Sequence, residues 1–559
     1  MKVVIVGGVA GGASAAARLR RLDEGAEIVV FERTGHISYA NCGLPYYVGG
    51  TIEDRADLTL QTPASFSSRF DVDVRVRSEV VSIDRVSKRV RVRSTVDGSE
   101  YDEGYDFLIL SPGARPIMPA SVPSGDPRIM TMRTVEDAIG IRGFVEENHP
   151  TRAVVCGAGY IGLEAAENLR RLGIDVTVVQ RSNHVLPQLD AEMAADVQRH
   201  LRCNGVRLVL SDALEGIGGG EGLGVRLASG RVLSADMAVI ALGVMPDTGL
   251  ARDAGLELGV KGSIVVDSHM RTSDPSIYAV GDAVQVVNYV SDQPANIALA
   301  GPANKQGRIA ADNIAGGDSE YRGTLGASVI KVFDMTVGAV GLTEKQASSI
   351  GIDSDKVYTY QASHATYYPG ARNMAVKTLF DPVTGAVLGA QIVGYEGVDK
   401  RIDVFATAIR AGMTVEDLAE LELSYAPPYS SAKDPVNYAG FVACNVMSGL
   451  VEQFHWNELD GMLAEGELFV DVRRPEEYAR GHLEGSLNIP LDELRSRLDE
   501  IPEGRTVNLI CQSGLRSYIA ARILEQRGYP CRHLAGGYRL YSSVMEDREA
   551  GSSENRPCE

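Results

Sequence analysis

The stretch from Lys2 to Glu32, KVVIVGGVAGGASAAARLRRLDEGAEIVVFE, decides the fold of this chain. It opens with a short apolar strand at 3–6, passes through a glycine-rich turn, continues as an alanine-rich helix over 13–22 and returns to a second strand at 27–31. This order is the opening of a β-α-β unit, in which the helix begins directly after the glycine turn. The sequence therefore predicts an α/β fold with a parallel sheet.

The glycine turn, GGVAGG at 7–12, is an imperfect dinucleotide-binding motif. Val9 stands where the pattern GxGxxG has its middle glycine, but the strand before it, the helix after it and Glu32, about 20 residues further on, restore the context. A carboxylate at that place accepts hydrogen bonds from a ribose, and the start of the helix faces a pyrophosphate. We expect a dinucleotide here; a glycine turn that serves packing alone is the alternative.

A second unit of the same kind runs from Ala153 to Val179. Its turn, GAGYIG at 157–162, matches the dinucleotide pattern in full, so we expect two dinucleotide sites in the chain. The next strand ends in Gln180 and Arg181, where an acid is usual. A carboxylate would repel a 2′-phosphate whereas Arg181 could pair with one, which favours NADPH, with NADH also accepted. An arginine that is merely solvated is the alternative.

Length, charge and composition narrow the function classes. The chain has 559 residues, 44% of them hydrophobic, and a formal net charge of −19, which allows several domains and has the wrong sign for a nucleic-acid partner. No apolar run reaches the roughly 18 residues that span a bilayer, and the N-terminus starts with a strand instead of a signal peptide. Seven cysteines at irregular spacing fit a reducing compartment. We expect a cytoplasmic protein without a membrane, nucleic-acid or metal site.

Two further regions follow the nucleotide units. Residues 321–445 combine strand patterns with a helix at Asp399–Ala411 and predict a mixed α+β domain. After a helical linker, a separate α/β module covers 453–545, and its segment NLICQSGLRSYIAARIL places Cys511 between a buried strand and a helix. The polar tail 546–559 lacks periodicity, and we expect it to be disordered from Asp547 onward.

The paired units, together with LILSPGARP at 108–116 and YAVGDA at 278–283, resemble the flavoprotein disulfide reductases that have two dinucleotide domains. The resemblance implies two Rossmann-like domains: FAD bound by 1–112 with 245–320, and NADPH or NADH bound by 113–244. It further implies a dimerisation domain over 321–445 and hence a homodimer. The cofactor residues that it carries over are Gly7, Ala10, Gly11, Gly12, Glu32, Arg33, Asn41, Val80, Ser111, Pro112, Gly113, Arg133, Gly157, Gly159, Tyr160, Ile161, Gly162, Gln180, Arg181, Gly243, Gly281, Asp282 and Ala300.

We expect the redox centre in SYANCGLPY at 38–46. Where well-known disulfide reductases have a CxxxxC pair, Cys42 has no second cysteine just downstream, so it should work alone through a mixed disulfide, persulfide or sulfenic acid. The segment resembles the single-cysteine branch, which contains coenzyme A-disulfide reductases, NADH-dependent persulfide reductases, NADH oxidases and peroxidases. A small buried cysteine without redox chemistry is the alternative.

Other segments resemble the coenzyme A enzymes of that branch. HATYYPGA at 364–371 supplies Tyr367 and SYAPPYSSAKDPVN at 424–437 supplies Tyr425; in those enzymes matching tyrosines reach the active site from the other subunit and assist departure of a thiolate. The residues carried over for coenzyme A are Ser14, Arg18, Arg21, Ser38, Asn41, Asn304 and Lys433. Phe70 stands where some of these enzymes have a lysine. Tyrosines that only pack and a solvated basic helix face are the alternatives.

The last module, which contains FVDVRRPEEYARGHLEGSLNIPL at 469–491, resembles the rhodanese fold. Its loop from Cys511 to Arg516 would hold an anionic persulfide with backbone N–H groups at the start of a helix. This loop is shorter than that of related phosphatases, which suits sulfur transfer. We expect Cys531 to pack in the core; an inactive rhodanese fold is the alternative.

Together these features predict an FAD- and NAD(P)H-dependent enzyme that reduces coenzyme A persulfide or polysulfide, and coenzyme A disulfide, through Cys42. Catalytic Cys511, with Arg516 in its loop, would supply sulfane sulfur. The rival predictions are coenzyme A disulfide as the main substrate, an NADH oxidase or peroxidase, and a non-catalytic redox sensor or sulfur-relay protein.

Overall fold

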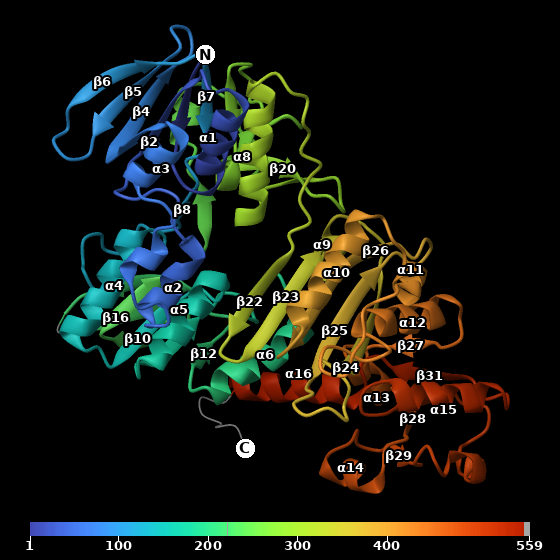
Figure 1. Cartoon of the computed structure of the whole chain (residues 1–559). Helices are drawn as coiled ribbons and strands as arrows, with labels where there is room; N and C mark the ends of the chain where they lie inside the picture. The colour runs from blue at the N-terminus through green and yellow to red at the C-terminus, as the bar shows by residue number, and fades with distance from the viewer. Residues whose placement is uncertain (221, 553–559) are drawn as a thin grey trace. The chain divides into compact units, whose positions relative to one another are not determined.

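The computed structural model describes residues 1–220 and 222–552 (Figure 1). The chain divides into two compact units, Met1–Arg181 with Gly205–Gly326, and Ser182–Asn204 with Ala327–Glu559. The first unit contains both predicted nucleotide folds, and the second contains the predicted dimerisation and rhodanese-like regions. Within the described residues, no helix combines the length and the apolar composition that crossing a bilayer needs.

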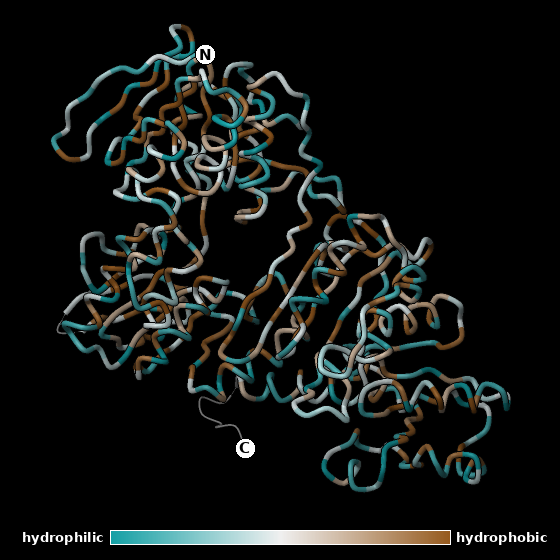
Figure 2. Tube along the Cα trace, viewed as in Figure 1, coloured by the Kyte–Doolittle hydropathy of each residue, from teal (hydrophilic) through white to brown (hydrophobic). Residues whose placement is uncertain are grey.

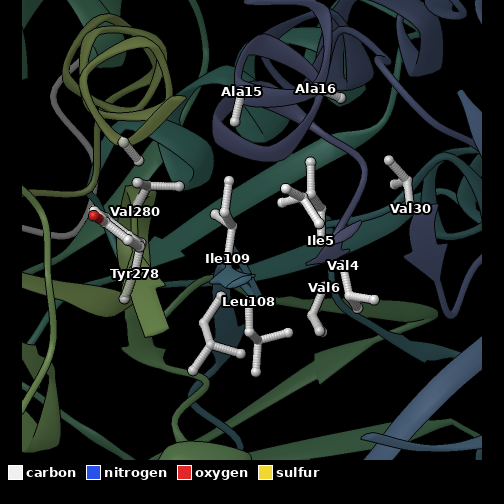
Figure 3. Packing of buried hydrophobic residues seen from close by; sticks show 14 of the residues in the cluster. Val4, Ile5, Val6, Ala15, Ala16, Val30, Leu108, Ile109, Tyr278 and Val280 are labelled. Carbon is white, nitrogen blue, oxygen red and sulfur yellow. The ribbon is translucent and has the colours of Figure 1, made fainter. Parts of the chain in front are cut away.

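The first unit begins with the predicted β-α-β arrangement. Its parallel sheet has the order β19-β7-β1-β2-β3, formed by β1 (Lys2–Val6), β2 (Glu27–Glu32), β3 (Asp73–Val76), β7 (Phe107–Leu110) and β19 (Ile277–Ala279). Helix α1 (Ala10–Leu22) packs side by side with α8 (Ala300–Ile314). Figure 3 shows Ala15 and Ala16 of α1 facing the apolar side chains of β1 and β7, which form the core of this fold.

The second nucleotide fold repeats this architecture. Its parallel sheet has the order β12-β11-β10-β16-β9, formed by β9 (Ile129–Met130), β10 (Arg152–Cys156), β11 (Asp175–Val179), β12 (Arg207–Val209) and β16 (Met237–Ile240). Helix α5 (Tyr160–Arg171) follows the complete glycine turn. Each fold also carries a three-stranded antiparallel sheet, β4 (Ser78–Asp84), β5 (Arg89–Ser94) and β6 (Glu100–Gly104) in the first, and β13 (Leu214–Gly218), β14 (Leu223–Leu227) and β15 (Val232–Ala235) in the second.

The second unit contains a five-stranded antiparallel sheet in the order β22-β23-β26-β25-β24. Its strands are β22 (Ser328–Val332), β23 (Met335–Gly341), β24 (Asp355–Ala362), β25 (Asn373–Phe380) and β26 (Val387–Gly394). Helices α10 (Val398–Arg410) and α12 (Pro435–Met447) pack on this sheet, and α10 agrees with the predicted helix at Asp399–Ala411. Helix α6 (Ala191–Cys203), which the sequence prediction placed in the NAD(P)H domain, also belongs to this compact unit.

The C-terminal module is a parallel sheet in the order β27-β31-β30-β28-β29. Its strands are β27 (Gln453–Phe454), β28 (Leu468–Asp471), β29 (Leu487–Asn488), β30 (Val507–Ile510) and β31 (Cys531–Leu534). Helix α15 (Leu515–Glu525) follows β30, and α16 (Gly537–Ser552) ends the described chain. Figure 2 shows hydrophobic stretches along the strands of the sheets, which agrees with buried cores.

The prediction of a disordered tail from Asp547 onward is wrong for 547–552, because α16 continues to Ser552. Asp547 forms an ion pair with Arg202 on α6 at 2.6 Å and also accepts a hydrogen bond from Gln198 on the same helix. These partners give a polar segment a fixed place that its composition alone does not indicate. The remainder of the predicted tail, 553–559, lies outside the described residues.

Candidate functional site

The first glycine turn is shaped by close backbone contacts. Gly7 has φ +99°, and a Cβ at this position would lie 2.0 Å from the carbonyl oxygen of Ser111. A Cβ at Gly12 would lie 1.9 Å from the carbonyl oxygen of Gly7. Only glycine fits at these two positions. Because neither residue has a side chain, the backbone of the turn can lie close to a ligand. Ala10 and Gly11 begin α1, and the apolar Val9 before them cannot cap its free N–H groups, which therefore remain available to a pyrophosphate.

The predicted acidic residue ends β2 beside this turn. The Glu32 carboxylate accepts a hydrogen bond from the Gly8 N–H at 3.0 Å and is buried. Arg33, the next residue, is half exposed and forms an ion pair with Asp247 at 2.9 Å. Val80 is buried in the core of this fold. The position of Glu32 fits the role of a ribose acceptor.

A second group of predicted cofactor residues gathers after β7 and β19. Ser111 lies against the glycine turn, and the Gly113 Cα lies beside the guanidinium of Arg133. That guanidinium forms an ion pair with Asp282 at 2.9 Å. Gly281, with φ +83°, donates its N–H to Gln306 on α8 at 2.7 Å. Two further predicted residues border these segments, Pro112 after β7 and Ala300 at the start of α8. The residues present fit an FAD site.

The second glycine turn has the same construction. Gly157 has φ +110°, and a Cβ there would lie 2.1 Å from the Ala241 carbonyl oxygen; a Cβ at Gly162 would lie 2.0 Å from the Gly157 carbonyl oxygen. The Gln180 side chain accepts a hydrogen bond from the Ala158 N–H at 3.1 Å, as Glu32 does in the first turn. An amide thus replaces a carboxylate, and Arg181 is exposed beside it. The other predicted residues are Gly159, Tyr160 and Ile161 at the start of α5, and Gly243 in the loop after β16.

Cys42 lies in a short 3-10 turn, Asn41–Gly43, directly before helix α2 (Leu44–Val48). It is a free thiol that solvent can reach. Partial burial, followed by the negative charges of Glu164 and Asp282, raises the pKa of this thiol, and Arg133 opposes the shift. The side chains of this chain alone therefore favour the protonated thiol over the thiolate at neutral pH.

Glu164 on α5 is a functional candidate that the sequence reasoning missed. Burial first, and then the charge of Glu167, raises its pKa to about 7, and the Tyr46 hydroxyl donates to its carboxylate at 3.3 Å. Burial in turn raises the pKa of Tyr46 to about 12. The only available sequence signal was an acid two residues after Gly162 in a nucleotide helix. The carboxyl can therefore change its protonation state beside Cys42 near neutral pH.

The residues predicted to bind coenzyme A are partly brought together on α1 and α8. The Ser14 hydroxyl donates to the Asn304 side chain at 2.7 Å, and Arg18 forms an ion pair with Asp312 at 2.6 Å. Arg21 is exposed one turn further along α1. The helix pair thus presents polar and cationic groups along one edge. Asp312 already pairs with the Arg18 guanidinium, which weakens the attraction of Arg18 for a phosphate.

Three more of these residues have distinct surroundings. Ser38 adopts φ +44°, and the buried side-chain oxygen of Asn41 has no hydrogen-bond partner within the described residues. That unsatisfied oxygen lies next to Cys42 in the chain and suits a ligand donor. Lys433 is exposed directly before α12 in the second unit. Phe70, which replaces a cation, packs against the Phe66 ring with their centroids 4.8 Å apart.

The two predicted tyrosines contact each other in the second unit. Their hydroxyl oxygens lie 2.6 Å apart, and both side chains are exposed, Tyr367 by 74% and Tyr425 by 46%. The hydrogen bond between the two hydroxyls raises the pKa of Tyr367. A buried guanidinium organises both loops, because Arg401 donates to the Ser363 carbonyl at 3.0 Å and to Asp434 at 2.9 Å. The sequence prediction named both phenols but not the arginine that positions them.

The cysteine of the C-terminal module lies in the loop between β30 and α15. Cys511 is 1% exposed, and the Gly514 N–H donates to its sulfur at 3.1 Å. Both terminal nitrogens of Arg516 donate to the Glu477 carboxylate at 2.7 Å. These hydrogen bonds lower the pKa of Glu477 to about 2. Cys531 is buried and donates to the Ala521 carbonyl, consistent with packing. The loop is therefore closed around the Cys511 sulfur, and Glu477 neutralises its arginine.

Sequence and structure comparisons agree with this description. Residues 1–307 match the family described as pyridine nucleotide-disulphide oxidoreductase, residues 327–435 match its dimerisation domain, and residues 455–543 match the rhodanese-like domain. The coenzyme A disulfide reductase of Staphylococcus aureus strain bovine RF122 / ET3-1 is 36% identical over 443 residues, which are 79% of this chain and 99% of that protein.

Two solved structures are similar over nearly the whole chain. Reduced CoADR-RHD from Bacillus anthracis is 48% identical, with 98% of each chain covered and a TM-score of 0.96. An NAD-dependent persulfide reductase from A. fulgidus is 40% identical, with 97% of this chain and 100% of that chain covered and a TM-score of 0.91. The chain therefore belongs to the pyridine nucleotide-disulphide oxidoreductase family of FAD- and NAD(P)H-dependent enzymes, and it carries the family's dimerisation domain and a C-terminal rhodanese-like domain.

Proposed function

We propose that this enzyme uses NAD(P)H to reduce the sulfane sulfur of coenzyme A persulfide or polysulfide at Cys42, and coenzyme A disulfide by the same route. The observation that carries the proposal is that a lone, free Cys42 thiol shares the chain with a second cysteine, Cys511, whose buried sulfur accepts a hydrogen bond from the Gly514 N–H. A dithiol reductase would need a cysteine partner for Cys42, whereas a persulfide needs only one sulfur to accept it. The names of the relatives, a coenzyme A disulfide reductase and a persulfide reductase, support both substrates.

Coenzyme A is the proposed thiol because the edge of α1 and α8 offers groups for its phosphates. Ser14, Arg18, Arg21 and Asn304 lie on these two helices, and Asn41 offers a buried acceptor beside Cys42. Phe70 cannot supply a cation, and Asp312 already pairs with Arg18. We therefore expect coenzyme A to bind, with an affinity that depends mainly on Arg21.

Tyr367 and Tyr425 are the proposed proton donors, and they would act from the partner subunit of a homodimer. Both phenols are exposed within one chain, and each hydroxyl already forms a hydrogen bond with the other. In such a pair one hydroxyl donates to the other, and the second proton remains free for a departing sulfur. The dimerisation domain supports the homodimer.

The proposed reaction has two steps at the Cys42 sulfur. The Cys42 thiolate attacks the outer sulfur of the persulfide, the S–S bond breaks, and the coenzyme A thiolate leaves and takes a phenol proton. Bound FAD, reduced by hydride from NAD(P)H, supplies two electrons. The S–S bond of the Cys42 persulfide then breaks, sulfide departs and Cys42 returns to a thiolate. With coenzyme A disulfide, Cys42 forms a mixed disulfide, and the two steps release two coenzyme A thiols. The Gln180–Arg181 pair favours NADPH, with NADH accepted.

The rhodanese-like domain also decides between the rival functions. An NADH oxidase, a peroxidase or a redox sensor has no use for a sulfur-carrying Cys511, whereas a persulfide reductase needs a supply of sulfane sulfur. We propose that Cys511, with Arg516 in its loop, takes up this sulfur as a persulfide and passes it to coenzyme A. If the main activity were the reduction of coenzyme A disulfide, the rhodanese-like domain would have no role in the reaction.

The test compares Cys42→Ser, Cys511→Ser and the control Cys444→Ser in the full-length FAD-containing enzyme. Sulfide release is measured with NADH or NADPH from coenzyme A persulfide and, separately, from thiosulfate plus coenzyme A. We expect Cys42→Ser to lose both reactions, Cys511→Ser to lose only the second, and Cys444→Ser, a half-buried free thiol, to keep both. Native rates of sulfide release in Cys42→Ser would refute the proposal.

A further inference from the structure

A buried hydroxyl lies within hydrogen-bond distance of both the Cys511 sulfur and a buried imidazole. The Ser517 oxygen is 3.3 Å from the Cys511 sulfur and 3.1 Å from Nδ1 of His533. All three side chains are buried, Cys511 by 99%, Ser517 fully and His533 by 96%. Ser517 comes from the first turn of α15, and His533 comes from β31. The contact between Ser517 and His533 therefore depends on the fold, since 16 residues separate them in the sequence.

The tautomer of His533 follows from its surroundings. Burial lowers the pKa of His533 to about 4, so the ring is neutral at pH 7 and carries one proton. Its Nε2 is buried and has no hydrogen-bond partner within the described residues. A buried N–H without an acceptor costs more than a buried lone pair without a donor. The proton therefore resides on Nδ1, which faces Ser517.

This tautomer directs the proton of Ser517. With Nδ1–H as a donor, the Ser517 oxygen accepts from His533, and its own proton can go to the Gly514 carbonyl at 2.9 Å or to the Cys511 sulfur. A thiolate is the stronger acceptor because it is charged. When Cys511 ionises, the Ser517 hydroxyl turns to its sulfur.

We propose that Ser517 and His533 are positioning residues of the sulfur-transfer site, which hold a hydroxyl donor on the Cys511 sulfur and thereby stabilise its thiolate. The inference rests on the proposed role of Cys511 as the sulfur carrier. The Cys511 thiolate is the form that takes up sulfur, and it forms again when the sulfur is released. Together with the Gly514 N–H, the hydroxyl gives the sulfur two directed donors from the chain.

The other charged and titratable groups around Cys511 remain in place in every test variant. Arg516 interacts with the Cys511 charge from α15, but both of its terminal nitrogens bind Glu477. Asp471, at the end of β28, pairs with Arg473 at 2.6 Å. Tyr438 of α12 also senses the charge of Cys511, which adds to burial in raising the pKa of that phenol. None of these groups changes when Ser517 or His533 is replaced.

Thiosulfate and cyanide provide a probe that needs neither flavin nor nicotinamide. The Cys511 thiolate attacks the outer sulfur of thiosulfate, the S–S bond breaks, and sulfite leaves with the bonding electrons. Cyanide then attacks the outer sulfur of the Cys511 persulfide, so that thiocyanate forms and the Cys511 thiolate returns. Both half-reactions begin or end with the anion that Ser517 is proposed to stabilise.

The test uses Ser517→Ala, His533→Leu and His533→Asn in the full-length FAD-containing enzyme. The pH dependence of Cys511 alkylation by iodoacetamide is followed by mass spectrometry of its peptide, together with kcat and KM for thiosulfate. We expect Ser517→Ala to slow alkylation at pH 7 about tenfold and to move its pH midpoint upward by about one unit. His533→Leu should shift in the same direction. His533→Asn, which keeps an N–H donor near the position of Nδ1, should restore most of the native profile.

The controls separate this proposal from the function that it rests on. Coenzyme A disulfide reduction at Cys42 should stay native in all three variants. If Cys511→Ser transfers sulfur from thiosulfate normally, the carrier role itself fails. If Cys511→Ser is inactive but Ser517→Ala keeps the native pH midpoint, only the positioning role is overturned. Ser517→Ala removes a single buried oxygen, so it decides the question even if His533→Leu does not fold.

Discussion

Replacement of Lys377 by methionine should destabilise the second unit more than any single surface change. The Lys377 ammonium is 1% exposed and binds three carboxylates, Asp190 at 2.8 Å, Glu192 at 2.6 Å and Glu344 at 2.8 Å. Oxygen atoms of these three acids lie within 4.8 Å of one another. Without the ammonium, several negative charges would share a buried space with no cation at their centre.

The magnitude follows from this geometry. Burial on its own lowers the pKa of Lys377, but the three carboxylates outweigh burial and raise it well above its ordinary value. Although burial also opposes their charges, Lys377 keeps the pKa values of Asp190 and Glu344 below their usual range. Removing one partner of a buried ion pair costs about 3–5 kcal/mol because the remaining charge is uncompensated. We expect Lys377→Met to lose an amount in this range at pH 8.

Urea unfolding monitored by Trp456, the chain's one tryptophan, measures this loss in the second unit. The matched control is Lys356→Met, which removes an ammonium that pairs with the same Glu344 but leaves Lys377 in place. It should cost about 1 kcal/mol, as for an ion pair at the edge of a core.

The pH dependence gives a second criterion. In the native protein, acids with lowered pKa values contribute stability above their unfolded pKa values, near pH 4, and lose it as the pH falls further. In Lys377→Met the same buried acids should take up protons already between pH 8 and 5, which relieves their repulsion. The difference between native protein and variant should therefore shrink over that range. A constant difference, or one no larger than that of Lys356→Met, would refute this electrostatic account.

Three further changes test other parts of the molecule. Gly162→Ala, whose Cβ would lie 2.0 Å from a carbonyl oxygen, should abolish NAD(P)H reduction of the enzyme while leaving its flavin absorbance intact. Glu164→Gln removes a carboxylate that raises the pKa of Cys42, so Cys42 alkylation at pH 7 should accelerate severalfold, and a step near pH 7 should vanish from its pH profile; an unchanged profile contradicts the assignment. Because the pKa of His533 is lowered to about 4, stability should fall as the pH drops below the ordinary value of 6.5, by roughly 3 kcal/mol at pH 4; His533→Asn should flatten this decline in an acid titration.

The glycine turns could be predicted from sequence because the constraint that produces them is local. Gly7 and Gly12 are five positions apart, and a Cβ on the second would meet the carbonyl oxygen of the first. Any chain that connects a strand to a helix in this way must place glycine at these two positions. Cys511 could be predicted for the same reason, since its loop is one continuous segment between a strand and a helix.

Residues that act through distant contacts could not be found in this way. The His533–Ser517 pair joins a strand to a helix, and the acids around Lys377 come from segments more than 180 residues away as well as from nearer ones. Charged residues in a sequence are usually solvated, so a buried lysine has no local signature. The tail was misjudged for a related reason: Asp547 is polar, but it meets Arg202 only after folding.

The two reactive cysteines have different neighbours, hydrogen-bond donors at Cys511 and a carboxylate near Cys42, and this contrast supports a direction for sulfur flow. The Cys511 sulfur receives a backbone N–H from Gly514 and lies within reach of the Ser517 hydroxyl, so an anionic persulfide is stabilised there. The Cys42 sulfur lies near the carboxylate of Glu164, which raises the pKa of its thiol and disfavours any anion that it carries. A persulfide should therefore persist on Cys511 and be short-lived on Cys42. These lifetimes are expected if Cys511 carries sulfane sulfur and Cys42 reduces it. Sulfur then moves from the cysteine with the more stable persulfide to the cysteine that releases it as sulfide.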